Sequence, residues 1–193
     1  MNKEIIKKRI GKIRRELNNR NIDCLIVTKP ANVTYTTGFL GDDSWAAITR
    51  GKVYFLTDSR YTEQAREECP DCTIVERTGL MPEAAGKLVK KLKSVQALTV
   101  EKSLSLAAFG ALKRHVKVRI KSVANVIENI RSSKDDTEIK TIEAAASIST
   151  EALENTLPYI NPGVTESELA GMLDFQIRKL GATNSFETIV AFG

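Results

Sequence analysis

The stretch Trp45-Ala-Ala-Ile-Thr-Arg-Gly-Lys-Val-Tyr-Phe-Leu-Thr57 decides the fold. It contains two runs of apolar, β-branched and aromatic residues, Trp45–Thr49 and Val53–Thr57, and Arg50-Gly51-Lys52 stands between them. This pattern predicts two strands joined as a β-hairpin. Because a hairpin pairs its strands antiparallel, a sheet that contains it is not purely parallel.

Helices and strands alternate on both sides of the hairpin. Helical spacing of Ile6, Ile10, Ile13 and Leu17 predicts an opening amphipathic helix. Further helices are predicted from about Tyr61, over Pro82–Lys93 and over Ser105–Arg114. Further strands are predicted over Asp23–Thr28, Cys72–Arg77, Ala97–Glu101 and Val116–Ile120, with a turn at Lys29–Asn32. The alternation indicates an α/β layered domain with a mixed sheet.

The charge changes sign at a polar stretch, Ile130–Asp136. Residues 1–131 carry 25 Lys and Arg against 14 Asp and Glu, whereas residues 132–193 carry 4 against 10. Such a shift in a polar segment is typical of a domain boundary. We therefore expect one domain over residues 1–130 and the start of another over residues 131–193.

The second unit has a different pattern. A long helix is predicted over Asp136–Tyr159, and Asn161-Pro-Gly163 ends it. Thr165-Glu-Ser-Glu168 has the spacing of a capping box that begins another helix, and Gly181 is suited to its C-terminal end. The last ten residues, 184–193, are read as a buried strand that has no partner strand after it.

Composition excludes several classes of protein. Hydrophobic residues make up 42% and charged residues 27%, which is ordinary for a folded domain. No apolar run approaches the roughly 20 residues of a membrane helix. No export signal is recognisable, so a cytoplasmic location is expected. The net charge of +5 is spread over amphipathic helices without an aromatic and basic RNA-binding motif, so nucleic-acid binding is not expected.

The three cysteines do not define a metal or redox centre by pattern alone. Cys24 lies in an apolar run and is interpreted as a core residue. Cys69-Pro-Asp-Cys72 is a C-x-x-C pair, but a zinc site needs two more ligands and the only histidine is His115. A thioredoxin-type pair opens a helix, whereas this pair follows one, so the pair is interpreted as ordinary thiols at a helix end. His115 is expected at the surface or at a strand edge.

Five segments, taken in order, resemble the creatinase/prolidase/aminopeptidase P family of metallopeptidases. These segments are Asn32–Phe39, Leu56–Ala65, Ile130–Ile139, Pro162–Leu169 and Ser185–Gly193. The resemblance implies a creatinase-like N-terminal α/β domain with a mixed sheet, followed by the truncated beginning of a pita-bread α+β catalytic domain. It also implies a cytoplasmic homodimer, formed through the N-terminal domain, that hydrolyses the Xaa-Pro peptide bond of proline-containing peptides as an aminopeptidase or dipeptidase.

The resemblance further implies two divalent metals, commonly manganese, held by two Asp, one His and two Glu late in the catalytic domain. Bridging carboxylates suit hard divalent ions, and the metal pair would lower the pKa of a shared water. Residues 132–193 contain no His or Cys, and their acidic residues lie on helical patterns as solvated faces and caps. We therefore assign no catalytic residue and no metal ligand to this chain, and expect no peptidase activity from it alone.

The first domain offers candidates for contact with substrate. The resemblance implies that this domain reaches over the catalytic cleft, and the candidate segments here are Gly38–Trp45 and Asp58–Tyr61. Asp42 or Arg60 would meet a charged peptide terminus, while Trp45 would pack on a side chain and Tyr61 lies beside them. A structural alternative is that Asp58 and Arg60 form a local ion pair and that both aromatic residues belong to the core.

Two other functions remain open at this stage. The chain is alternatively a non-catalytic creatinase-like module for oligomerisation or protein binding, or part of a creatinase-type hydrolase that works without metal. The continuation of the coding region distinguishes these alternatives by its metal ligands. Because two helices and one strand leave apolar surface uncovered, residues 132–193 are expected to be mobile, to self-associate or to dock on another polypeptide.

Overall fold

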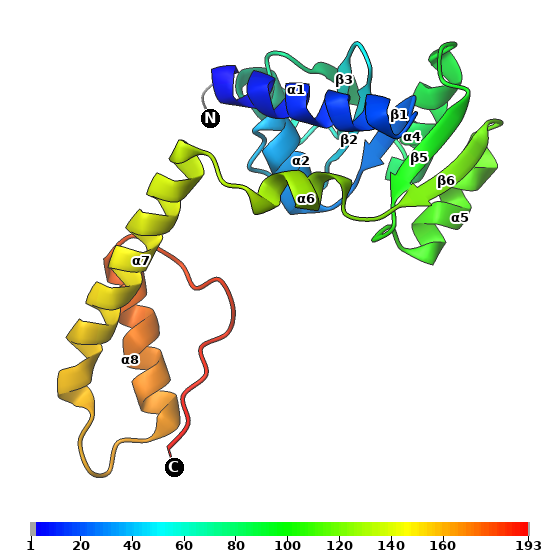
Figure 1. Ribbon diagram of the computed structural model, residues 1–193. Helices are drawn as coiled ribbons and strands as arrows, with labels where there is room; N and C mark the ends of the chain where they lie inside the picture. Colours follow the sequence, from blue (N-terminus) through cyan, green and yellow to red (C-terminus); the bar gives the residue numbers. More distant parts are fainter. Residues whose placement is uncertain (1–2, 193) are drawn as a thin grey trace. The chain divides into compact units, whose positions relative to one another are not determined.

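The computed structural model describes residues 3–192 (Figure 1). These residues fall into two compact units, one that ends at Ser133 and one that begins at Lys134. The first unit is a layered α/β domain, and the second is a pair of helices followed by an irregular segment. Each unit is described by itself.

The first unit contains six strands and six helices among the described residues. The strands are β1 (Cys24–Val27), β2 (Trp45–Thr49), β3 (Val53–Thr57), β4 (Thr73–Glu76), β5 (Ala97–Glu101) and β6 (Arg119–Val123). The helices are α1 (Lys3–Asn19), α2 (Pro30–Thr37), α3 (Thr62–Glu68), α4 (Met81–Lys91), α5 (Leu106–His115) and α6 (Val126–Ser132).

The six strands form one mixed sheet in the order β4-β3-β2-β1-β5-β6. The pairs β1–β2 and β2–β3 are antiparallel, whereas β3–β4, β1–β5 and β5–β6 are parallel. The predicted mixed sheet and its hairpin are therefore confirmed. Since only β2 runs against the others, five strands end at the same edge of the sheet, and β2 begins there. We call this edge the carboxyl edge.

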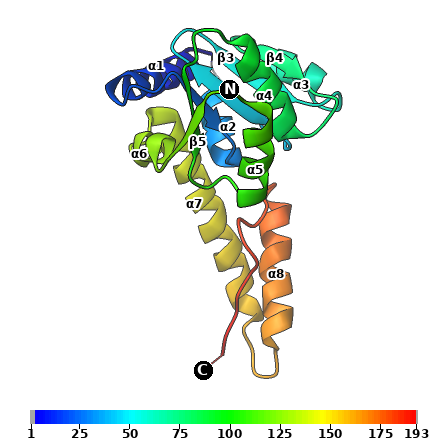
Figure 2. The same ribbon diagram turned by 90° about the vertical axis from the view of Figure 1, so that its right-hand side faces the viewer.

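Helices cover both faces of the sheet (Figure 2), and the layer between helices and sheet is apolar on each face. On one face α1, α2 and α6 pack over the sheet with side chains such as Leu17, Leu25 and Ile127. On the other face α4 and α5 pack over Ile26 and Leu98. Alternation along the strands explains the division, because successive side chains of a strand point to opposite faces.

The turn predicted at Lys29–Asn32 is wrong, because α2 begins there. Pro30 occupies the first helical turn, where its missing N–H and its fixed φ are no disadvantage. Gly38 ends this helix with φ +86°, a left-handed conformation that favours glycine. Its N–H donates to the carbonyl of Thr34 at 2.8 Å.

Three further predictions for the first unit need correction. The strand predicted at Val116–Ile120 lies at Arg119–Val123, and α6, which was not predicted, follows it and runs into the polar stretch that begins at Ile130. His115 is the last residue of α5 rather than a strand-edge residue. It packs against α4, because a Cβ added to Gly86 would overlap the Cβ of His115.

The second unit consists of two helices with well-defined starts. These are α7 (Asp136–Thr156), continued by the short 3-10 helix η1 (Leu157–Tyr159), and α8 (Glu166–Lys179). A capping box begins each helix: Asp135 with Glu138 for α7, and the predicted Thr165 with Glu168 for α8. Gly181 follows α8 with φ +78°, as its predicted C-terminal position requires.

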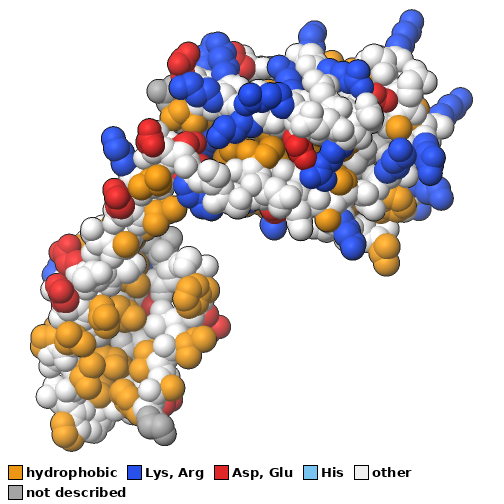
Figure 3. Space-filling view, in the orientation of Figure 1, with side chains coloured by type: hydrophobic (Ala, Val, Ile, Leu, Met, Phe, Trp, Pro, Cys, Tyr) orange, Lys and Arg blue, Asp and Glu red, His pale blue; other side chains and the backbone are white. Residues whose placement is uncertain are grey.

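The predicted buried strand at the C-terminal end is wrong for residues 184–192, and residue 193 lies outside the described residues. This segment has no strand structure, and Phe186 and Ile189 are 75% and 84% exposed. Residues 134–192 contain no strand that could accept its backbone hydrogen bonds, and an isolated strand is not stable in water. Figure 3 shows many hydrophobic side chains gathered on one face of this unit.

None of the helices in residues 3–192 combines the length and the apolar character that a membrane span requires.

Candidate functional site: the carboxyl edge of the sheet

Three connecting segments meet at the carboxyl edge. Residues 38–44 lead into β2, residues 58–61 leave β3, and residues 77–80 leave β4. The antiparallel pairing of β2 with β3 places Trp45 opposite Leu56, and the parallel pairing of β3 with β4 places Thr57 opposite Glu76. These registers bring the start of β2 beside the ends of the next two strands. In open α/β sheets this edge is where ligands usually bind.

Two carboxylates and two guanidinium groups form a closed ring at this edge, which we call the edge ring: Asp43, Asp58, Arg60 and Arg77. Arg60 Nη2 donates to Asp58 Oδ2 at 2.7 Å and to Asp43 Oδ2 at 2.8 Å. Arg77 Nη2 donates to the same two oxygens, and its Nη1 donates to the carbonyl of Gly79 at 2.7 Å. Each carboxylate thus contacts both cations, and the edge ring connects all three segments.

The edge ring favours the ionised form of Asp58. Hydrogen bonds from Arg60, together with the charge of Arg77, lower the pKa of Asp58 to about 2. The Asp58 and Arg77 side chains are each only 15% exposed, whereas Arg60 is 65% exposed. Asp58 and Arg77 therefore form the inner half of the edge ring, and Arg60 presents its guanidinium to solvent.

Aromatic packing fixes the segment that carries Asp43. The ring of buried Phe39 lies 4.7 Å from that of Phe55 and 5.8 Å from that of Tyr61, the latter edge-to-face. A Cβ added to Gly41 would approach Phe39 Cζ to 2.6 Å, so the backbone passes too close to the ring for a side chain. The loop turns back over Phe39 because residue 41 is glycine.

The four residues predicted to lie near substrate are not one cluster. Arg60 and Tyr61 are adjacent, and the Arg60 guanidinium carbon lies 5.4 Å from the centre of the Tyr61 ring. Asp42 is exposed beside the edge ring, but it is Asp43 that contacts Arg60. Trp45 is half-buried and packs against the core of the opposite face, under α4 and α5.

The alternative, in which these residues form an ion pair and pack in the core, is partly confirmed. The Asp58–Arg60 ion pair is present, Tyr61 packs against the core beside Phe39, and Trp45 packs against the other core. Exposure is compatible with ligand contact for Asp42 and Arg60, whereas Trp45 and Tyr61 offer only part of their surface. A role in substrate contact stays a prediction for all four residues.

Sequence reasoning missed Asp43 and Arg77. Asp43 stands next to Asp42, and no local pattern distinguishes the two; the structure gives Asp43 a left-handed φ of +47°, which turns the chain at this point. Arg77 comes 19 residues after Asp58 and meets it only because β3 and β4 pair in parallel. The signal that would have found it is the polar residue directly after each of two neighbouring parallel strands.

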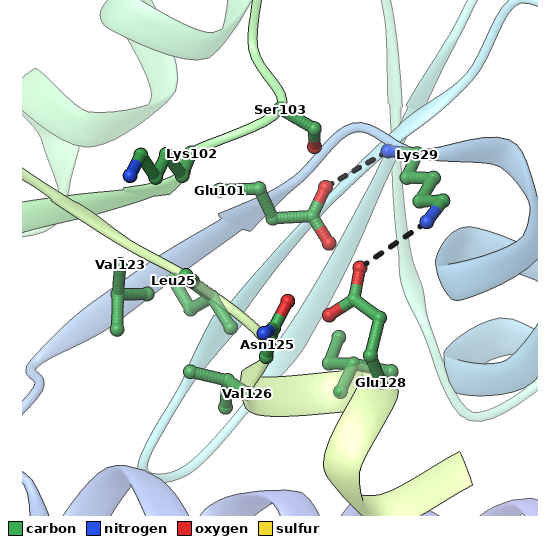
Figure 4. A pocket seen from close by; sticks show the side chains of 11 residues that line it. Leu25, Lys29, Glu101, Lys102, Ser103, Val123, Asn125, Val126 and Glu128 are labelled. Atoms are coloured by element: carbon green, nitrogen blue, oxygen red, sulfur yellow. Dashed lines mark hydrogen bonds and ion pairs between the residues drawn. The ribbon is translucent and has the colours of Figure 1, made fainter. Parts of the chain in front are cut away.

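A second polar group lies along the same edge, at the ends of β1 and β5 (Figure 4). It lines a pocket of about 300 Å³ between the ends of these strands and α6. Glu101 is only 7% exposed, and its carboxylate accepts hydrogen bonds from the backbone N–H groups of Thr28 and Lys29 at 2.7 and 2.8 Å. The Lys29 ammonium also contacts Glu128 at 3.5 Å.

Asn32 joins this pocket to α6. Its amide nitrogen donates to Glu101 Oε1 at 2.7 Å and to Glu128 Oε1 at 2.9 Å, and its amide oxygen accepts from Arg131 at 2.8 Å. Burial acts to raise the pKa of Glu128, but hydrogen bonds from Asn32 and Lys29 outweigh it and leave the pKa lowered. The carboxylates of the pocket are thus already matched by internal donors, and the network holds α2, β5 and α6 together.

The metal site implied by the resemblance was tested against the residues present. Within residues 3–192 no group of three or more His, Cys, Asp or Glu is placed to hold a metal ion. In the second unit, Glu168 caps α8 and the Asp174 carboxylate accepts hydrogen bonds from Asn184 and Thr188. The described residues therefore do not fit a dinuclear metal centre.

Comparison with known proteins agrees with this architecture. Residues 9–133 match the model of the creatinase/prolidase N-terminal domain, and residues 140–193 match metallopeptidase family M24. The fold and these matches define a creatinase-like α/β domain followed by a segment of an M24 peptidase domain. The chain belongs to the creatinase/prolidase family.

Individual relatives are similar to this chain across both matched regions. The uncharacterized peptidase YqhT of Bacillus subtilis is 31% identical over 187 residues, which is 96% of this chain and 53% of that protein. The Xaa-Pro dipeptidase of Pyrococcus horikoshii is 28% identical over 98% of this chain and 53% of its own length. The solved structure of an Xaa-Pro dipeptidase from Bacillus anthracis superposes with a TM-score of 0.86 at 31% identity, over 91% of this chain and 49% of that one. The chain thus spans about half the length of the relatives that it matches.

Proposed function

We propose that the chain is the N-terminal half of a proline-specific metallopeptidase, an Xaa-Pro aminopeptidase or dipeptidase. The observation that carries the proposal is the order of the two family matches, 9–133 and 140–193, on one chain that is similar to Xaa-Pro peptidases over nearly all its length. In this proposal a dinuclear metal site, with manganese as the expected metal, is formed by residues that follow residue 193. Residues 1–130 form the creatinase-like domain and residues 131–193 begin the pita-bread domain.

The same proposal assigns the first domain two tasks. It forms a homodimer in the cytoplasm, and its carboxyl edge contributes to the binding of a proline-containing peptide. Arg60 is the best placed of the candidates, because its guanidinium is exposed yet held by Asp58 and Asp43. A fixed, exposed cation suits a carboxylate of the substrate, since a held side chain loses less conformational entropy on binding.

The first experiment is to sequence the coding region beyond residue 193 and to measure the intact mass of the natural protein. A continuation with two Asp, one His and two Glu in family order supports the proposal. The full-length protein is then assayed on Xaa-Pro dipeptides and longer Xaa-Pro peptides, with matched Xaa-Ala peptides as controls. We expect hydrolysis of the Xaa-Pro series that a chelator abolishes and divalent manganese restores.

Two outcomes would replace the proposal by its alternatives. Histidines without the metal carboxylates, together with chelator-insensitive hydrolysis, would indicate a metal-free creatinase-type hydrolase. Loss of all the ligands together with no hydrolysis would indicate a non-catalytic binding module.

The role of Arg60 has its own test in the full-length protein. Arg60→Gln is expected to lower kcat/KM by about tenfold on Xaa-Pro substrates, chiefly through KM. Arg50→Gln is the matched control, because Arg50 also pairs with an aspartate, Asp23 at 3.4 Å, but lies in the hairpin at the opposite edge. Equal kinetics for the two variants would contradict the assignment.

A further inference from the structure

Cys69 and Cys72 stand at the two ends of the turn that follows α3, and the proposed peptidase function uses neither. Cys72 N donates to the carbonyl of Cys69 at 2.9 Å, which is the hydrogen bond of a β-turn. Such a turn holds its first and last Cα atoms within about 7 Å, close to the separation that a disulfide spans. The backbone is therefore arranged for a bond between these two sulfurs without a change of fold.

The two side chains also interact electrostatically. A hydrogen bond with Cys72, and a second with Thr37, lower the pKa of Cys69, while the same Cys72–Cys69 hydrogen bond raises the pKa of Cys72. The two thiols are thus close enough for each to change the ionisation of the other. Cys69 is 2% exposed in the core under α1 and α2, and Cys72 is half-buried at its border.

Cys24 provides the contrast within the same molecule. It is fully buried in β1, and burial raises its pKa to about 12. While the chain is folded, no reagent reaches a thiol at this depth, whereas Cys72 lies at the border of its core. Among the free cysteines of the described residues, Cys24 is therefore an internal reference that folding protects.

We propose that Cys69 and Cys72 are a reversible disulfide site, oxidised by a low-molecular-weight disulfide such as glutathione disulfide. Cys72, the less buried of the two, gives up its thiol proton to solvent and attacks one sulfur of the oxidant, whose S–S bond breaks as a mixed disulfide forms and one thiolate is released. Cys69, as the thiolate, then attacks the sulfur of Cys72, which forms the Cys69–Cys72 bond and releases the second thiolate. Two protons leave with the two released thiols, so the protein is oxidised by two electrons and the reagent is reduced by two.

The location makes this a modification site rather than a catalyst of disulfide exchange. The pair follows α3 instead of opening it, so it lacks the positive end of a helix dipole that activates thioredoxin-type thiols. Burial of Cys69 also prevents a second protein from attacking that sulfur. The neighbouring Glu68 accepts a hydrogen bond from Leu40 N at 2.9 Å, which connects the turn to the loop beside the edge ring.

The test is thiol mapping of the folded protein. The chain is incubated with glutathione disulfide, alkylated with N-ethylmaleimide during unfolding, and digested with trypsin. Cleavage after Arg66 and Arg77 isolates peptide 67–77 with both cysteines, and the Lys29–Pro30 bond resists cleavage, so peptide 21–50 carries Cys24 alone. We expect peptide 67–77 to lose both reactive thiols and to be about 2 Da lighter than its reduced form, while Cys24 stays reactive. Dithiothreitol is expected to reverse the change.

Two variants separate the roles of the sulfurs. Cys69→Ala removes the resolving thiol, so a glutathione adduct, about 305 Da heavier, is expected to accumulate on Cys72. Cys72→Ser leaves only the buried Cys69, which is expected to remain reactive after unfolding and free of adduct.

Three results would overturn the proposal, and the wild-type chain alone supplies all of them. One is a peptide 67–77 that keeps both thiols after prolonged incubation. Another is a stable glutathione adduct on the wild-type peptide without a Cys69–Cys72 bond. The third is oxidation of Cys24 at the same rate as the pair, because that would indicate reaction of the unfolded chain.

Discussion

Arg77 donates to Asp58 at 3.1 Å across two parallel strands, and both side chains are only 15% exposed. This contact anchors the edge ring in the sheet, while Arg60 and Asp43 complete it toward solvent. Because Asp58 lies between two cations, its ionised form is strongly favoured in the folded state. The edge ring therefore makes the stability of the first unit sensitive to acid.

Asp58→Asn is expected to remove part of this acid sensitivity. The folded-state pKa of Asp58 is lowered to about 2, against about 3.9 in unfolded chains, so its stabilisation is complete above pH of about 4 and is lost as the pH falls toward 2. The difference in urea midpoint between wild type and variant should thus be largest near pH 6 and shrink below pH 4. Asp42→Asn, at an exposed neighbouring position, is the control. A constant difference across this range would refute the assignment.

Asp43→Asn is expected to loosen the loop that leads into β2. The substitution removes the charge that both Arg60 and Arg77 contact. Trp45, the single tryptophan, follows directly and reports on the loop by fluorescence. We expect faster hydrogen exchange of residues 40–44 and faster quenching of Trp45 by acrylamide. High salt should produce a similar change in the wild type, because exposed ion pairs are screened.

The control for the loop is again Asp42→Asn, which alters charge at the adjacent position without touching the edge ring. Identical exchange rates in both variants would show that the ring does not order the loop.

The sheet was predictable because its signals are local. The hairpin and the five-residue run Ala97–Glu101 have the bounds that the alternating and apolar patterns indicate. The second helix, α2, was missed because Lys29-Pro30 was interpreted as a turn, although proline also suits a first helical turn. A local pattern leaves this choice open; burial of Val33 and Tyr35 in the core settles it.

The candidate site was predictable only in part, because it depends on contacts between distant segments. Asp58 and Arg60 are only two positions apart, and the sequence suggested their ion pair. Arg77 and Asp43 join the same group through strand order and register, which the sequence pattern does not specify. The misread final strand has a similar cause, since residues 184–192 look apolar enough for a strand but find no partner strand among the described residues.

Gly86→Ala is expected to destabilise the first unit although alanine is the better helix former. In an exposed helix interior, replacing glycine by alanine would raise the free energy of unfolding by about 1 kcal/mol. At Gly86, however, the new Cβ would overlap His115 Cβ and approach the backbone of that residue to 3.2 Å, so α4 and α5 would have to separate. We expect the free energy of unfolding, measured in urea, to fall by about 1–3 kcal/mol.

Gly110→Ala in α5 is the matched control, because nothing lies within 4 Å of its added Cβ. This variant should be stabilised by up to about 1 kcal/mol. A stabilised Gly86→Ala protein would show that the two helices are not in close contact there.

Asn32→Ala is expected to lower the free energy of unfolding by about 2–3 kcal/mol. The substitution removes one hydrogen-bond donor from the buried Glu101 and breaks the contact that connects α2 and β5 to α6. The measurement is equilibrium unfolding followed by circular dichroism, with hydrogen exchange to test whether α6 opens first. Asn129→Ala, exposed on α6, should stay within about 0.5 kcal/mol of wild type. Equal effects of the two substitutions would contradict the proposed network.

The second unit is expected to self-associate when the 193-residue chain is isolated. Its helices and the following segment line an apolar pocket of about 630 Å³, and Phe175, Phe186 and Ile189 expose 62%, 75% and 84% of their surface. Apolar area of this kind is favourably removed from water by a second copy. Sedimentation velocity should therefore show concentration-dependent dimers or larger species.

Replacing Phe186 and Ile189 together by Ser should shift this equilibrium toward monomer. Leu106→Ser, which changes an 89% exposed leucine of the first unit, should leave it unchanged and serves as the control. A chain that stays monomeric at high concentration, with slow hydrogen exchange over residues 186–192, would show instead that this segment is covered within one molecule. The expectation rests on exposed apolar side chains, so the Ser variant tests it more directly than a truncation, which would also remove the contacts of Asp174 with Asn184 and Thr188.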